Sequence, residues 1–171
     1  MPDHCHLLVR RNKDGQMGRL FRWVTGTHPL RHHGHCNTRG YGHLYQARFK
    51  SFRVQADSHF YTVFRYVERN SVRVKLVSSA KPWKHGSLLR WNPSSEPNPR
   101  ILTPWPIRRL PNWNHRVDAA LSKPAFDALR PSVERGQPYG SPEWVEEVAE
   151  QHGLWSTIRL AGLPRKRKPA T

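Results

Sequence analysis

The chain has 171 residues, a hydrophobic fraction of 36% and a mean hydropathy of −0.80, so it is polar for a globular protein but long enough to bury a core. It carries 29 Lys and Arg against 12 Asp and Glu, a net charge of +17, which favours a polyanionic partner such as nucleic acid. Its apolar runs are too short to predict a bilayer-spanning segment, and two cysteines exclude a disulfide framework and indicate a reducing cytoplasm.

The first predicted element is a strand within the opening sequence MPDHCHLLVR. Alternate residues of a strand point to one face, so His4 and His6 share a side while Cys5 points to the other. Two imidazoles presented together suit a divalent metal or a pair of acidic oxygens, and many such pairs bind nothing. The residues of this strand leave that choice open.

A helix is predicted over residues 17–30, because apolar side chains recur there at helical spacing. The histidine-rich segment 31–42 holds three glycines and few apolar residues, which predicts a loop. Residues 43–54 alternate apolar or aromatic with polar side chains and predict one or two strands of an antiparallel ribbon. This ribbon carries Arg48, Lys50 and Arg53.

An amphipathic helix is predicted over residues 57–77, with Asp57 as its N-cap. Tyr66 and Asn70 are four residues apart and so lie on one face, at the edge of the predicted apolar stripe. A side chain at this edge can be held firmly and still reach a ligand. A boundary tyrosine that packs its ring and hydrates its hydroxyl explains the same pattern.

The second half of the chain begins with a proline-rich segment, residues 92–116, whose six prolines predict a linker or an extended wrap. Two helices are predicted around 117–135 and 142–152, the second with Ser141 as N-cap. The closing residues 161–171 are predicted to form a basic, disordered tail.

Several stretches taken together resemble a known family. MPDHCHLLV resembles the histidine–hydrophobic–histidine motif of single-tyrosine HUH transposases, which are transposases of the IS200-like type. GHLYQARFKSF and YVERNSVRVKLV resemble the next two blocks of the REP-associated tyrosine transposase branch. The resemblance continues in order through PWKHGSLLRW, LTPWPIRRLPNW, SVERGQPYG and PRKRK, and so covers nearly the whole chain.

The resemblance implies an α+β fold, in which helices pack on the ferredoxin-like antiparallel sheet of HUH nucleases. It implies a catalytic domain over residues 1–91, a linker over 92–116, a C-terminal helical extension over 117–160 and a tail over 161–171. Family members carry further residues before the histidine motif, whereas Met1 here is the methionine of the motif itself. We therefore expect the catalytic domain to lack its N-terminal element, either because the gene start is misplaced at an internal Met-Pro or because the copy is truncated.

The resemblance also assigns roles to individual residues. Tyr66 matches the nucleophilic tyrosine, and His4, His6 and Asn70 match the ligands of Mg2+ or Mn2+. The implied activity is metal-dependent cleavage and strand transfer of single-stranded DNA with short palindromic hairpins, through a 5′-phosphotyrosyl intermediate. The expected protein is a nucleoid-associated monomer or homodimer of the cytoplasm, with no membrane partner. The residues expected to contact DNA are Arg48, Lys50, Arg53, Arg69, Arg73, Arg165, Lys166, Arg167 and Lys168.

Three other interpretations compete with this one. The first is a catalytically inactive remnant or repressor that binds DNA hairpins, and the second is a basic RNA-binding or ribosome-associated protein. Neither requires both histidines, the tyrosine and the asparagine together. The third is a structural zinc site, although its spacing fits no standard zinc pattern. Its candidate ligands are His4, Cys5, His6, His32, His33, His35 and Cys36.

Overall fold

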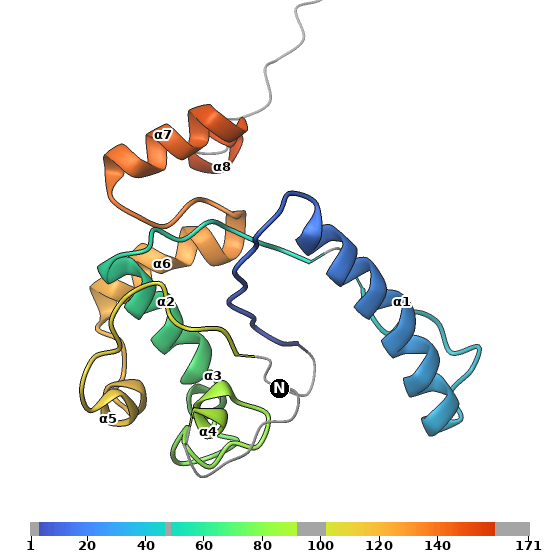
Figure 1. Cartoon of the computed structure of the whole chain (residues 1–171). Coiled ribbons are helices and arrows are strands. Elements are labelled where there is room, and N and C mark those ends of the chain that lie inside the picture. The colour runs from blue at the N-terminus through green and yellow to red at the C-terminus, as the bar shows by residue number, and fades with distance from the viewer. Residues whose placement is uncertain (1–3, 47–48, 92–101, 160–171) are drawn as a thin grey trace, which may run out of the picture.

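The computed structural model describes residues 4–46, 49–91 and 102–159 (Figure 1). Within these ranges the chain is helical, and none of the described helices is long and apolar enough to cross a membrane. The helices are α1 (Gln16–Cys36), α2 (Ser58–Glu68), α3 (Asn70–Arg73), α4 (Ser87–Arg90), α5 (Trp113–Asp118), α6 (Lys123–Arg135), α7 (Pro142–His152) and α8 (Trp155–Ile158).

The predicted antiparallel sheet is wrong: the described residues contain no strand, and so the ferredoxin-like α+β fold is not found. Val54 and Tyr139 form an isolated parallel bridge, in which Gln55 N–H donates to the Tyr139 carbonyl at 2.9 Å. The segments 4–10 and 49–56 run without helical structure and turn some apolar side chains towards α2. The alternation of apolar and polar residues in these segments thus indicates an extended chain that packs one face. It does not indicate pairing with a second strand, which depends on residues far away in the sequence.

The predicted helix over residues 57–77 is present in part, as α2 followed directly by α3, with a break at Arg69 and an end at Arg73. Asp57 caps α2 as predicted, because its carboxylate accepts a hydrogen bond of 2.8 Å from the His59 N–H. The predicted apolar stripe is buried at Phe60, Val63 and Phe64. This helix is therefore fixed to the rest of the molecule along one whole face.

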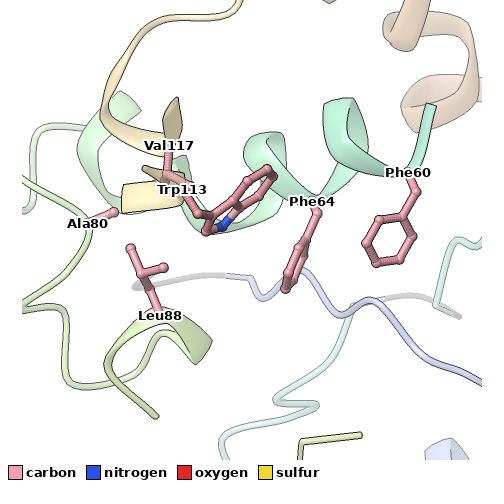
Figure 2. Close-up of a cluster of buried hydrophobic side chains, with 6 residues drawn as sticks. All are labelled: Phe60, Phe64, Ala80, Leu88, Trp113 and Val117. Carbon is pink, nitrogen blue, oxygen red and sulfur yellow. The ribbon is translucent and has the colours of Figure 1, made fainter. Parts of the chain in front are cut away.

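One side of α2 packs into an aromatic core that also receives α4 and α5 (Figure 2). Trp113 is 3% exposed, and its ring stacks 5.9 Å from that of Phe64. Trp105 meets both rings edge to face, although it comes from a segment predicted as a linker or wrap. The described part of that segment, residues 102–112, therefore lies against the core, and residues 92–101 lie outside the described ranges.

A second buried cluster joins α2 to α6 through Val63 and Leu129, with Tyr139 beside them. Gln55 anchors the chain next to this cluster, because its side-chain oxygen accepts a 2.7 Å hydrogen bond from the Ser141 N–H. Gly140 fits this junction because a Cβ there would lie 2.6 Å from the same oxygen. Helix α6 thus packs on α2 at Val63, about one turn before Tyr66.

The two predicted C-terminal helices fare differently. The helix over 142–152 is confirmed as α7, and Ser141 caps it by accepting a 3.3 Å bond from the Trp144 N–H. The helix over 117–135 is instead divided into α5 and α6, because Ser122 starts a new helix with Pro124 in its first turn. The predicted tail, residues 161–171, lies outside the described ranges.

Helix α1 stands apart from the other helices in Figure 1 and buries none of its residues. Its links to the chain include the Phe21 ring, which stacks 4.4 Å from Phe49, and a 2.8 Å hydrogen bond between His28 Nδ1 and the Tyr45 hydroxyl. The loop predicted from residue 31 is wrong up to Cys36, where the helix ends. A single glycine such as Gly34 costs a helix only about 1 kcal/mol, so it need not stop one.

Candidate functional site

The histidine pair lies in the extended N-terminal segment, which runs beside α2 on the side of α1 (Figure 1). Leu8 anchors this segment because it packs against both buried clusters. The rings of His4 and His6 lie 5.1 Å apart and nearly perpendicular, at 78°. Cys5 is exposed. The pair is therefore held together at the molecular surface even though the predicted strand is not formed.

Tyr66 lies on α2, one turn beyond the buried stripe, and its side chain is half-buried. Its ring meets the His6 ring at 5.2 Å in an edge-to-face contact. The Arg73 guanidinium lies 5.7 Å from the same ring, and Phe126 of α6 lies 6.3 Å away. The fold thus brings together a histidine, a tyrosine and a cation from three separate elements.

Asn70 begins α3 and is only 4% exposed. Its side-chain oxygen accepts two hydrogen bonds from Arg73, at 3.1 Å from Nε and 2.8 Å from Nη2. The lone pairs that a cation would use are therefore engaged by a guanidinium. A metal bound through Asn70 would require Arg73 to swing away, which is feasible because the Arg73 side chain is exposed.

His6 has the properties of a metal ligand. Its Nε2 atom is buried and has no hydrogen-bond partner among the described residues. Burial lowers the pKa of His6, and the neighbouring His4 and Arg73 lower it further. The neutral ring with an available nitrogen is the form that binds divalent metals. The donor atoms of the predicted ligand set suit a divalent cation: they are imidazole nitrogens of His4 and His6 and the amide oxygen of Asn70.

The zinc interpretation has no support in the described ranges, where no group of three or more His, Cys, Asp or Glu is placed to hold a metal. His33 instead shares a 2.8 Å hydrogen bond with Thr38. Cys36 is exposed and lies 3.7 Å from His32 along the same helix. These side chains are accounted for by contacts within α1 and its C-terminal turn.

The basic residues predicted to contact DNA lie in different environments. Lys50 is exposed, Arg53 is half-buried, and Arg73 contacts Asn70 and Tyr66. Arg69 donates through Nε to the Asp118 carbonyl at 3.2 Å, so part of its hydrogen-bonding capacity holds α5 in place. The remaining predicted residues lie outside the described ranges: Arg48, Arg165, Lys166, Arg167 and Lys168.

Sequence reasoning missed two residues that shape this site. Phe126 of α6 comes from the C-terminal extension, and no local signal places it beside Tyr66. Glu68 is 6% exposed on the inner side of α2, where it accepts hydrogen bonds from Trp113 Nε1 at 2.7 Å and Ser87 Oγ at 2.8 Å. Burial raises the pKa of this carboxyl, while the two donors and Arg109 oppose the shift. Glu68 therefore ties the tyrosine helix to α4 and α5.

Comparison with known proteins finds one family that resembles the N-terminal part of the chain. Residues 1–70 match the family described as transposase IS200-like, and this range contains both histidines, Tyr66 and Asn70. This match confirms, for residues 1–70, the resemblance to IS200-like transposases drawn from the first sequence blocks. No curated protein and no solved structure matches the chain.

Proposed function

We propose that the chain is a metal-dependent nuclease and strand transferase of the REP-associated type, which cuts single-stranded DNA at hairpin-forming repeats. The observation that carries this proposal is the 5.2 Å contact between the rings of His6 and Tyr66. A tyrosine acts as a nucleophile on DNA when its hydroxyl is held in line with a phosphate whose developing charge is stabilised. The match to a transposase family supports this use of the pair.

In the proposed reaction, the Tyr66 hydroxyl oxygen attacks the scissile phosphorus and gives up its proton. A bond forms between tyrosine oxygen and phosphorus, the bond from phosphorus to the 3′ oxygen breaks, and that oxygen leaves as a 3′-hydroxyl after it gains a proton. The 5′-phosphotyrosyl product keeps the bond energy, so a 3′-hydroxyl can attack it and rejoin strands. Arg73, beside the Tyr66 ring, supplies positive charge for the phosphate.

The proposed cation is Mg2+ or Mn2+, held by His4, His6 and the side-chain oxygen of Asn70. Bound there, it would supply positive charge to the phosphate oxygens. The buried free nitrogen of His6 supports its role as a ligand, and Arg73 must release the Asn70 oxygen for the third contact. His6 also orients the Tyr66 ring through their edge-to-face contact.

The test is incubation of the protein with labelled hairpin DNA, with and without Mg2+ or Mn2+, followed by a denaturing gel. We expect a metal-dependent covalent protein–DNA band that is lost in Tyr66→Phe and in His6→Ala. Tyr41→Phe is the matched control, because Tyr41 is 85% exposed and should not affect the adduct.

Hairpin binding without an adduct, in the presence of either metal, would contradict the nuclease proposal. It would leave the second candidate, a catalytically inactive hairpin-binding remnant. The two hydrogen bonds that Arg73 donates to Asn70 favour that candidate, because they occupy a predicted metal ligand.

A further inference from the structure

A small cavity of about 180 Å3 opens beside Tyr66, between the tyrosine helix and the C-terminal extension. Its lining comes from α2, α3, the connection between α5 and α6, and α6, and it does not include His4 or His6. The lining residues are Tyr66, Arg69, Arg73, Ala120, Leu121 and Phe126.

The lining of this cavity combines two kinds of side chain. Ala120, Leu121 and Phe126 form its apolar wall, in which Phe126 is 36% exposed. Arg69 and Arg73 add positive charge to the lining. Arg69 uses Nε to bond the Asp118 carbonyl, and its two terminal nitrogens are the part that can face the cavity. An aromatic ring and guanidinium groups that line one cavity suit a ligand with a flat ring and a negative charge.

The apolar wall is held in a fixed position relative to Tyr66. Arg65 donates to the carbonyls of Arg116 and Ala119 at 2.8 and 3.1 Å, so the chain entering the cavity wall is tied to α2. Leu129, one turn beyond Phe126 on α6, is 1% exposed and packs on Val63 of α2. These contacts hold both ends of the apolar wall against α2.

We propose that this cavity binds one unpaired nucleotide of the DNA substrate, next to the phosphate that Tyr66 attacks. The base stacks on Phe126, and the phosphate of the same nucleotide faces Arg73. This inference rests on the proposed function for its ligand, and it adds that the C-terminal extension contributes to substrate recognition. Phe126 is then a residue that positions the strand for cleavage.

The experiment uses a DNA hairpin with single-stranded flanks, in which 2-aminopurine replaces each unpaired base in turn. Stacking of this base on an aromatic ring quenches its fluorescence. The protein carries Tyr66→Phe, which retains the ring but prevents covalent reaction, so that binding is read without cleavage. We expect one position to be quenched on binding, and we expect Phe126→Leu to abolish that quench and weaken binding about 5- to 100-fold.

Two further variants control for indirect effects. Phe126→Tyr keeps an aromatic face and should retain the quench, and Tyr41→Leu removes an aromatic residue outside the cavity and should change neither signal. Quenching that is absent at every position, or that survives Phe126→Leu unchanged, would overturn the inference. Quenching through Phe126 in a protein that forms no adduct would support the cavity and contradict the nuclease proposal. An adduct that forms in a protein whose quench does not depend on Phe126 would support the nuclease proposal and contradict the cavity proposal.

Discussion

Helices α1 and α2 were both predicted from apolar residues at helical spacing, yet they have opposite relations to the rest of the molecule. Helix α2, with 11 residues, buries Phe60, Val63, Phe64 and Glu68. Helix α1 is longer, with 21 residues, and buries none. The apolar side chains of α1 are exposed instead: Trp23 is 63% exposed and Leu30 is 75% exposed.

The comparison shows that helical spacing predicts a helix better than it predicts burial. In α2 the apolar residues form one continuous stripe that two clusters can cover. In α1 they are interrupted by arginines, glycines and histidines, and none of the residues of this helix is buried. The candidate nucleophile lies on the helix that is anchored, where its position is fixed by packing on both sides.

The largest expected difference between the two helices concerns their aromatic residues. Phe64→Ala should lower the free energy of unfolding by about 3–5 kcal/mol, because it removes a ring from the centre of the aromatic core. Trp23→Ala on α1 should change it by no more than about 0.5 kcal/mol, since this side chain is exposed. Urea denaturation followed by circular dichroism measures both. Equal losses would contradict the description of α1 as unanchored.

A second prediction concerns the carboxyl that joins α2 to α4 and α5. Glu68→Gln should lower the free energy of unfolding at neutral pH by about 1–3 kcal/mol, because one of the two buried donors loses its acceptor. Glu146→Gln, on an exposed position of α7, is the matched control and should have little effect.

The same carboxyl gives a pH dependence whose sign follows from its raised pKa. The folded state binds the Glu68 proton more tightly than the unfolded state, so wild-type stability falls as pH rises from 4.5 through the raised pKa. Glu68→Gln has no proton to lose there. The free energy of unfolding of wild type, relative to that of this variant, should therefore decrease over that pH interval. Denaturation of both proteins at several pH values measures this difference. An increase of the difference with pH would contradict the raised pKa of Glu68.

A third, smaller difference lies at the N-termini of the two helices. Asp57→Ala should cost about 0.5–2 kcal/mol, because it removes the side-chain cap of α2. The N-cap of α1 is Gly15, which supplies no side-chain cap, so Asp14→Ala beside it should cost less than about 0.5 kcal/mol. Thermal unfolding compares the two variants, and a larger loss for Asp14→Ala would reverse the ranking of the helix starts.

The smallest expected effect would stabilise α1 itself. A Cβ at Gly26 meets no atom within 4 Å, so Gly26→Ala should strengthen the helix by about 0.5–1 kcal/mol. Amide exchange within α1 should slow, while exchange in α2 stays unchanged because the two helices share no buried residues. Slower exchange throughout both helices would show that they unfold together.

The sequence predicted those features of the fold that depend on neighbouring residues, such as helix caps and helix bounds. Asp57 and Ser141 each cap the helix that they were expected to begin, and α7 has the predicted bounds. The sheet was wrong because alternation reports packing on one face, whereas strand pairing depends on a distant partner. Tyr66 was placed correctly at the edge of the buried stripe, but Phe126, Glu68 and their contacts depend on distant parts of the chain. The roles of His4, His6, Tyr66 and Asn70 stay predictions.

The most direct test of the central claim, that the tyrosine of the anchored helix attacks DNA, is to locate the linked residue. The protein is reacted with hairpin DNA and Mg2+ or Mn2+, digested with nuclease and trypsin, and analysed by mass spectrometry. Trypsin releases residues 66–69, YVER, as a peptide with a single tyrosine. The account predicts nucleotide mass on this peptide. Nucleotide mass on a peptide that carries Tyr41, Tyr45, Tyr61 or Tyr139 instead, or on none, would contradict it.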